Sequence, residues 1–168
     1  MRPLVICCSQ RFKEELETLT AFLEKNGVLI FAPDFKRHRA DHIRKDEEKR
    51  LESDSYRDKV PGLVWAHFNN LELVKNMGGI CLIFNPLTKG RHNKETGYIG
   101  SNTQGEVGYA AALKLTTIFL KPHSEKWMMT VAHEKDRKRI FTFAFPGKNP
   151  LDDLEFLWTS WLKPWLGA

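Results

Sequence analysis

This sequence has few cysteines and no long uninterrupted apolar run. Its 168 residues include three cysteines, too few for a complete disulfide framework, and each lies inside an apolar run. We therefore interpret them as small core residues in a reducing compartment. No apolar stretch approaches the roughly 20 residues that a bilayer span needs, and the one near the start is too short for a signal peptide. These absences predict a cytoplasmic protein with no membrane partner.

The common nucleotide and metal fingerprints are also absent. Gly100-x4-Gly105 is followed by Glu-Val, so it lacks the lysine and hydroxyl of a phosphate-binding loop. No Gly-x-Gly-x-x-Gly dinucleotide pattern occurs either. His38 and His42 share a helix face at i, i+4, but no third ligand is spaced to join them. We predict no cofactor and no metal.

The charge balance gives little support to a nucleic-acid partner. Lys and Arg number 26 against 21 Asp and Glu, which makes the net charge +5. Nine basic and seven acidic residues fall together between residues 36 and 59, and this mixture is typical of a solvated helix with internal ion pairs. We predict an insertion at 36–60, with a helix near 39–53. The basic cluster at 135–139 is short and has no interleaved aromatic residue, which base stacking would need.

Five short runs rich in β-branched and aromatic residues predict five strands. The first four are continuous, as in strands buried on both faces of a parallel sheet, and the fifth alternates, as an edge strand can. The length fits one domain, residues 1–168. The expected strands are residues 4–8, 28–32, 80–84, 116–120 and 140–145.

Helical patterns separate these strands. The first runs from Phe12 to Leu23 and is stopped by Asn26-Gly27. Asn149-Pro150 reads as a cap followed by proline at the first helical position, and opens a last helix over 149–166. Its tryptophans either pack in the core or bury against a second subunit. The expected helical stripes are Val64, Phe68, Leu71 and Val74; Val107, Ala110, Ala111 and Lys114, in a helix that begins near Asn102; and Leu151, Leu154, Trp158, Trp161 and Trp165.

This alternation predicts an α/β fold: a three-layer, doubly wound sandwich with a five-stranded, mostly parallel sheet. The flavodoxin-like order 2-1-3-4-5 is expected, and ligands then bind where strands 1 and 3 diverge. Two loops meet there, one directly after strand 1 and one after Asn85. Alternatively, Ser9 caps the first helix and Arg11 is a solvated charge. The predicted substrate-binding residues of these loops are Ser9, Gln10, Arg11, Phe12, Asn85, Gly100, Ser101, Asn102 and Thr103.

The most informative segment is 97–110, GYIGSNTQGEVGYA. Its first two glycines allow tight turns before a helix whose free N–H groups suit a phosphate or carboxylate. Ser101 to Thr103 are either helix caps or ligands of a sugar hydroxyl or 5′-phosphate. Glu106 has two interpretations. Thr103-x-x-Glu106 matches a capping box, in which the carboxylate bonds the start of its own helix; otherwise the carboxylate points into the ligand site.

The residues of three segments resemble the nucleoside 2-deoxyribosyltransferase-like family, which includes deoxynucleoside 5′-monophosphate N-hydrolases. They are residues 80–85, ICLIFN; residues 97–110; and residues 117–122, TIFLKP. The resemblance covers roughly residues 3–122. It implies the same five-stranded parallel sandwich, and a nucleophilic Glu106 that attacks the anomeric carbon of deoxyribose. It also implies a homodimer or higher oligomer in which a neighbouring chain completes the site.

The expected chemistry is that of a retaining glycosidase, in which a covalent glycosyl-enzyme reacts with water or with a second base. Many relatives carry an aspartate just before strand 3, whereas this chain has Met77-Gly78-Gly79. Asp34 is the substitute acid that we expect, and Tyr98 either orients the carboxylate, stacks on the base or packs the loop. The prediction is N-glycosidic cleavage or deoxyribosyl transfer on a nucleoside or nucleoside monophosphate. The alternative is a catalytically silent nucleotide-binding or signalling module.

Overall fold

A computed structural model of the chain contains a single five-stranded sheet in the order β2-β1-β3-β4-β5 among the residues it describes, which are 1–35, 54–86, 97–122, 139–143 and 149–168. All four strand pairings are parallel. The predicted α/β fold and strand order are therefore confirmed. The strands are β1 (Leu4–Cys8), β2 (Ile30–Phe31), β3 (Ile80–Phe84), β4 (Thr117–Phe119) and β5 (Ile140–Thr142).

The centre of the sheet is the long pairing between β1 and β3. The two strands run in register from Leu4 opposite Ile80 to Cys8 opposite Phe84, and every residue of both is buried. Strand β2 is shorter than predicted and only half-buried. The reason is its place at one edge of the sheet, where it has a neighbour on one side only. Strand β5 lies at the other edge, the place that its sequence pattern allowed, with Ile140 buried and the next two residues half-buried.

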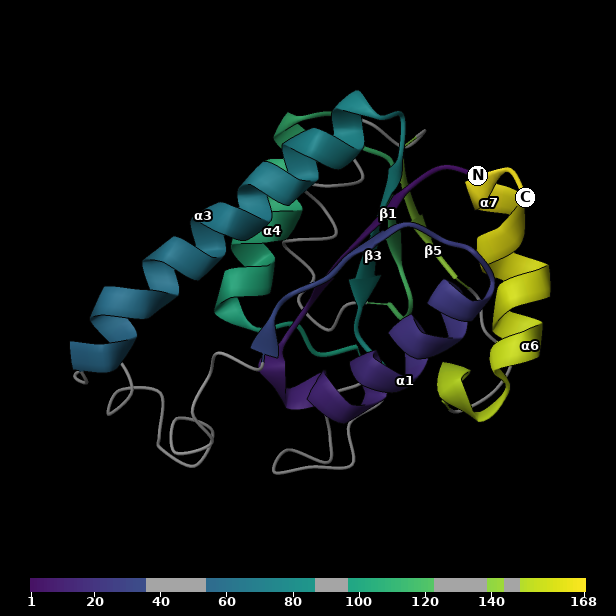
Figure 1. The fold of residues 1–168 in the computed structure, drawn as a ribbon, viewed down its shortest axis with the longest axis horizontal. Helices are drawn as coiled ribbons and strands as arrows, with labels where there is room; N and C mark the ends of the chain where they lie inside the picture. Colours follow the sequence, from purple (N-terminus) through teal and green to yellow (C-terminus); the bar gives the residue numbers. More distant parts are fainter. Residues whose placement is uncertain (36–53, 87–96, 123–138, 144–148) are drawn as a thin grey trace.

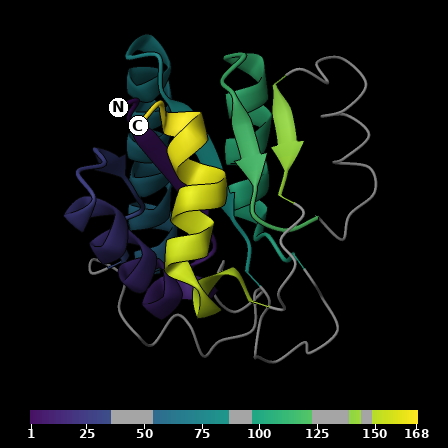
Figure 2. The same cartoon turned by 90° about the vertical axis from the view of Figure 1, so that its right-hand side faces the viewer.

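Helices cover both faces of the sheet (Figures 1 and 2). Helices α3 (Asp54–Asn76) and α4 (Ser101–Ala112) lie on one face, over Val5 and Cys7 of β1. Helix α1 (Lys13–Lys25) and the C-terminal helical segment lie on the other, over Leu4, Ile6 and Cys8. Because side chains alternate along a strand, neighbouring cysteines 7 and 8 face different cores.

Helix α1 is entered through a 3-10 turn, Gln10–Phe12, which Ser9 caps by accepting a hydrogen bond from the Arg11 amide. Helix α3 begins earlier than its apolar stripe indicated, so that residues 54–60 of the predicted insertion belong to it. The expected helix near 39–53, His38 and His42, and the basic cluster at 135–139 lie outside the described residues.

The C-terminal segment differs from the single helix predicted over 149–166. Asn149 caps a short 3-10 turn, and Asp153 then caps α6 (Leu154–Leu157). A π-helical stretch, Trp158–Leu162, leads into α7 (Lys163–Leu166). The wider π turn rotates the buried face, so Leu157, Leu162 and Leu166 are fully buried although the predicted stripe omitted them.

The tryptophans of this segment pack within the chain. Trp158 is buried, Trp161 lies against Phe143, and Trp165 lies against Phe141. Trp161 and Trp165 remain half-buried, so the predicted alternative of contact with a second subunit stays open. The two ends of the chain lie side by side (Figures 1 and 2), and the Arg2 amide donates to the carbonyl of Leu166.

None of the helices in the described ranges combines the length and the apolar character that crossing a membrane requires.

Candidate functional site

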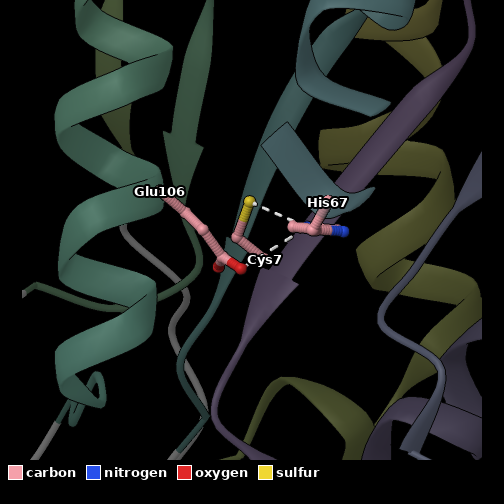
Figure 3. A group of neighbouring side chains, drawn as sticks. All are labelled: Cys7, His67 and Glu106. Carbon is pink, nitrogen blue, oxygen red and sulfur yellow. Dashed lines mark hydrogen bonds and ion pairs between the residues drawn. The ribbon is translucent and has the colours of Figure 1, made fainter. Parts of the chain in front are cut away.

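Glu106 lies in the second turn of α4 and is not part of a capping box. The N-cap of α4 is Gly100, and no side chain caps the helix there. Thr103 is therefore the third residue of the helix and cannot be its cap, which makes the capping-box interpretation wrong. The carboxyl group is free of that local role and points inward from α4 toward the sheet (Figure 3).

Three buried side chains from three elements meet at this carboxyl group: Cys7 of β1, His67 of α3 and Glu106 of α4 (Figure 3). His67 Nε2 lies 3.4 Å from Cys7 Sγ and 3.9 Å from Glu106 Oε1. Glu106 and His67 are 6% and 4% exposed. The second carboxyl oxygen, Oε2, is buried without a hydrogen-bond partner. An orphaned acceptor of this kind costs stability, and the described part of the chain has two further buried polar atoms of this kind, Thr142 Oγ1 and Trp161 Nε1.

Burial sets the protonation state of all three groups. It raises the pKa of Glu106 from 4.5 to about 8, against a smaller opposing contribution from the Cys7 side chain. It lowers the pKa of His67 from 6.5 to about 4, although a hydrogen bond of the ring with the backbone of Ile6 opposes this. Burial also raises the pKa of the Cys7 thiol well above its usual value. At neutral pH the contact between His67 and Glu106 therefore joins an imidazole to a carboxylic acid and is not an ion pair.

A second sulfur lies next to these three side chains. Cys81 Sγ of β3 is 3.7 Å from Cys7 Sγ, within hydrogen-bonding distance for two thiols. We define the buried cluster as Cys7, His67 and Glu106, with Cys81 as its neighbour on the sheet.

The two loops predicted to meet beside the sheet do meet. The Arg11 guanidinium lies over the Tyr98 ring, 4.4 Å from its centroid, and a Cβ added at Gly100 would lie 3.4 Å from Ser9 Oγ. Tyr98 also packs its ring against Phe12. The contacts seen for Tyr98 are thus those of loop packing with a cation–π partner, the interaction that holds Arg11 in place.

Asn85 positions the loop and does not offer its amide to a ligand. Its side chain is fully buried; it donates to the carbonyls of Gly97 and Lys121 and accepts from the Lys121 amide. Gly97 has a φ of +75°, and a Cβ there would lie 1.9 Å from the Pro122 carbonyl oxygen. Only glycine fits this position, as the sequence predicted for the first glycine of the segment.

The remaining predicted residues fall into two groups. Phe12 is 1% exposed and packs edge-on against Phe84 in the core, and Thr103 is also buried. The prediction that these two side chains contact a substrate has no support from their positions. Gln10 is half-buried, and Ser101 and Asn102 are exposed in the first turn of α4.

Asp34 is exposed and follows edge strand β2. The Glu106 carboxyl itself lies against the Cys7 thiol and the His67 imidazole. The pairing of Asp34 with Glu106 stays a prediction.

Residues 77–79, where the family resemblance leads us to expect an aspartate, lie far from Glu106 in this fold. These residues form the turn that enters β3 at its amino end, where the Gly79 amide bonds the Val74 carbonyl. Cys7 pairs with Ile83, near the other end of the same strand. Gly79 and Ile83 are four residues apart along the strand, which at about 3.3 Å per residue is about 13 Å. An acid before β3 therefore could not contact Glu106.

Sequence reasoning missed Cys7 and His67. The sequence indicates only a core residue at Cys7, and His67 belongs to no spaced motif. One signal was present: His67 precedes Phe68 in an otherwise apolar helix stripe, and a polar residue beside a core stripe needs a buried partner.

Comparisons with protein-family models, with curated proteins and with solved structures find no match to this chain.

Proposed function

We propose that this protein cleaves or transfers the N-glycosidic bond of a nucleoside or nucleoside monophosphate, through a covalent glycosyl-enzyme formed on Glu106. The observation that carries the proposal is the Glu106 carboxyl, which is buried, has one unpaired oxygen and faces an imidazole. The 2-1-3-4-5 sheet order and the resemblance of residues 80–122 to the deoxyribosyltransferase-like family support it. The resemblance also carries the proposal of a homodimer, for which a monomeric mass at micromolar concentration would be contrary evidence.

In this proposal His67, in place of Asp34, is the acid that protonates the departing base. The pair of Glu106 and His67 holds one proton between pH about 4 and about 8. Passing this proton from Oε1 to Nε2 turns the acid into a carboxylate nucleophile and the imidazole into an acid. The separation of 3.9 Å must shorten by about 1 Å for the transfer, which is common when a substrate tightens a catalytic contact.

The reaction balances with these two groups. The carboxylate attacks C1′ as the bond from C1′ to the base nitrogen breaks, and the imidazolium gives its proton to the departing base. Water or a second base then attacks C1′ and breaks the ester. The carboxylate is restored, and the proton of the incoming nucleophile returns to the pair.

The test is incubation of the purified protein with a panel of deoxynucleosides and their 5′-monophosphates, with chromatographic detection of free base. Glu106→Gln keeps the shape of the side chain and should lower base release by at least about 10³-fold. Glu155→Gln is the matched control, because Glu155 is exposed on α6 across the sheet. Base release that survives Glu106→Gln unchanged would refute the nucleophile assignment.

A catalytically silent nucleotide-binding module is the second candidate. Burial of Glu106 in its protonated form favours it, because a neutral acid is a poor nucleophile. This candidate predicts that equilibrium dialysis detects a bound deoxynucleoside monophosphate while no base is released over hours. Release of base at a rate that depends on Glu106 excludes it.

A further inference from the structure

We propose that the buried cluster of Cys7, His67 and Glu106 is a binding site for a zinc ion. It offers one sulfur, one nitrogen and one carboxylate oxygen, and these three atoms all lie within 4.8 Å of one another. Thiolate, imidazole and carboxylate are the three ligand types of protein zinc sites. The ligands come from three separate elements, β1, α3 and α4, so the arrangement is held by the tertiary fold.

Two of the three distances between the ligand atoms are close to those of a tetrahedral zinc site, and the third, between Cys7 Sγ and the Glu106 carboxylate oxygen, is at most 4.8 Å. Zinc bonds of about 2.3 Å to sulfur and 2.0–2.1 Å to nitrogen place those two ligands about 3.5 Å apart. Cys7 Sγ and His67 Nε2 are 3.4 Å apart. The separation of 3.9 Å between His67 Nε2 and Glu106 Oε1 has to shorten by about 0.6 Å to reach the tetrahedral value. A rotation of the glutamate side chain, whose Oε2 is unpaired, can supply this movement.

Charge also favours a divalent cation. A thiolate and a carboxylate together carry two negative charges, which burial disfavours in the absence of a counter-ion. A zinc ion neutralises both, and it leaves the neutral imidazole as the third ligand. The site as a whole is then uncharged, which suits a glutamate that is only 6% exposed.

The surroundings resemble the outer shell of a metal site. The His67 ring hydrogen bonds the backbone of Ile6, the type of contact that fixes the orientation of a ligating histidine. The Cys81 thiol, 3.7 Å from Cys7 Sγ, can donate to the sulfur once that sulfur is a thiolate. A three-residue set leaves the fourth zinc position open.

The inference goes beyond the proposed function, and one consequence links the two. A carboxylate bound to zinc cannot attack C1′, so zinc should inhibit base release in proportion to site occupancy. Binding itself is measured without substrate, and its outcome does not depend on the proposed activity.

The test uses the full chain after treatment with a chelator. Addition of Co²⁺ should produce a thiolate-to-cobalt charge-transfer band that saturates at one equivalent and disappears when Zn²⁺ is added. At neutral pH, zinc binding should release about two protons, one from the Cys7 thiol and one from the Glu106 acid. Cys7→Ser should remove the charge-transfer band, and Glu106→Gln should weaken zinc binding by at least about 100-fold, more than most outer-shell changes.

Cys8→Ser is the matched control, because Cys8 is buried next to Cys7 in the chain but faces the opposite core. It should bind one zinc with unchanged affinity. Glu106→Gln preserves size and so still reports on the site if Cys7→Ser does not fold. The inference is wrong if the wild-type chain retains no zinc after dialysis, if the cobalt band persists in Cys7→Ser, or if Cys8→Ser loses zinc equally.

Discussion

At the scale of single residues, one physical cause moves the pKa values of Glu106 and His67 in opposite directions. Burial disfavours charge, so it keeps the acid protonated and the base unprotonated. The two values, about 8 and about 4, lie on either side of neutrality. Two neutral groups then share one movable proton, which explains how α3 and α4 tolerate a carboxyl and an imidazole in the core between them.

These shifts predict an unusual dependence of stability on pH. Between pH 4.5 and 6.5, Glu106 keeps its proton only in the folded state, so its contribution to stability falls as the pH rises. Over the same range His67 keeps its proton only in the unfolded state, so its contribution rises and offsets the fall. Above pH 6.5, Glu106 is the one of these two groups whose protonation still differs between the folded and unfolded states. The free energy of unfolding should therefore fall between pH 6.5 and 8 by about 2 kcal/mol, or about 1.4 kcal/mol per pH unit. Urea titrations at half-unit intervals measure this.

The control for this prediction is Glu106→Gln, which is neutral at every pH. In this variant the decline between pH 6.5 and 8 should vanish, and stability should instead rise from pH 4 to 6.5 through His67 alone. Equal slopes in the two proteins above pH 6.5 would mean that another group causes the decline.

One of the three residues of the buried cluster could be predicted from the sequence. Glu106 stood out because it follows a glycine-rich approach to a helix. Cys7 and His67 lie 60 positions apart, and only the crossing of α3 over β1 brings them together. No spacing rule encodes that crossing, so their contact with Glu106 requires the tertiary structure.

At the scale of elements, the loop that enters α4 is held by one side chain and one glycine. Asn85→Ala would leave the Gly97 carbonyl and both backbone groups of Lys121 without these partners. We expect a loss of about 2–4 kcal/mol in the free energy of unfolding, since each buried unsatisfied group costs about 1–3 kcal/mol. Gly97→Ala should cost at least about 3 kcal/mol, because positive φ adds to the clash with the Pro122 carbonyl.

Gly108→Ala is the matched control for the loop prediction. Gly108 lies in α4 with nothing within 4 Å of an added Cβ, and alanine should stabilise the helix there by up to about 1 kcal/mol. All three variants are compared by urea unfolding at one pH. A loss below about 1 kcal/mol for both Asn85→Ala and Gly97→Ala would show that the loop is not held in this way.

Element boundaries show where sequence patterns stop being informative. The pattern of α1 and the Asn26-Gly27 stop agree with the structure because capping depends on neighbouring residues alone. The C-terminal stripe was predicted with a 3.6-residue period, and the π turn at Trp158–Leu162 breaks that period. Packing against the sheet, which a local pattern does not contain, selects the residues that become buried.

At the scale of the whole molecule, the strand order could be predicted because few topologies satisfy five short strands separated by crossovers. The continuous apolar runs of β1 and β3 indicated a centre covered on both faces, and the structure has one core on each side. The sequence did not indicate that the two cores differ in chemistry. The core under α1 and the C-terminal segment is apolar around Cys8, whereas the core under α3 and α4 contains the buried cluster.

This division predicts how the C-terminal segment contributes to stability. Leu162 is fully buried in the core under α1, so Leu162→Ala should lower the free energy of unfolding by about 2–5 kcal/mol. Because the segment packs on its own sheet, this loss should stay the same when the protein concentration is raised 100-fold. Trp65→Ala is the control: Trp65 is 63% exposed on α3, and its loss should cost less than about 1 kcal/mol. A loss for Leu162→Ala, relative to the wild type, that changes with protein concentration would instead place the segment at a subunit interface.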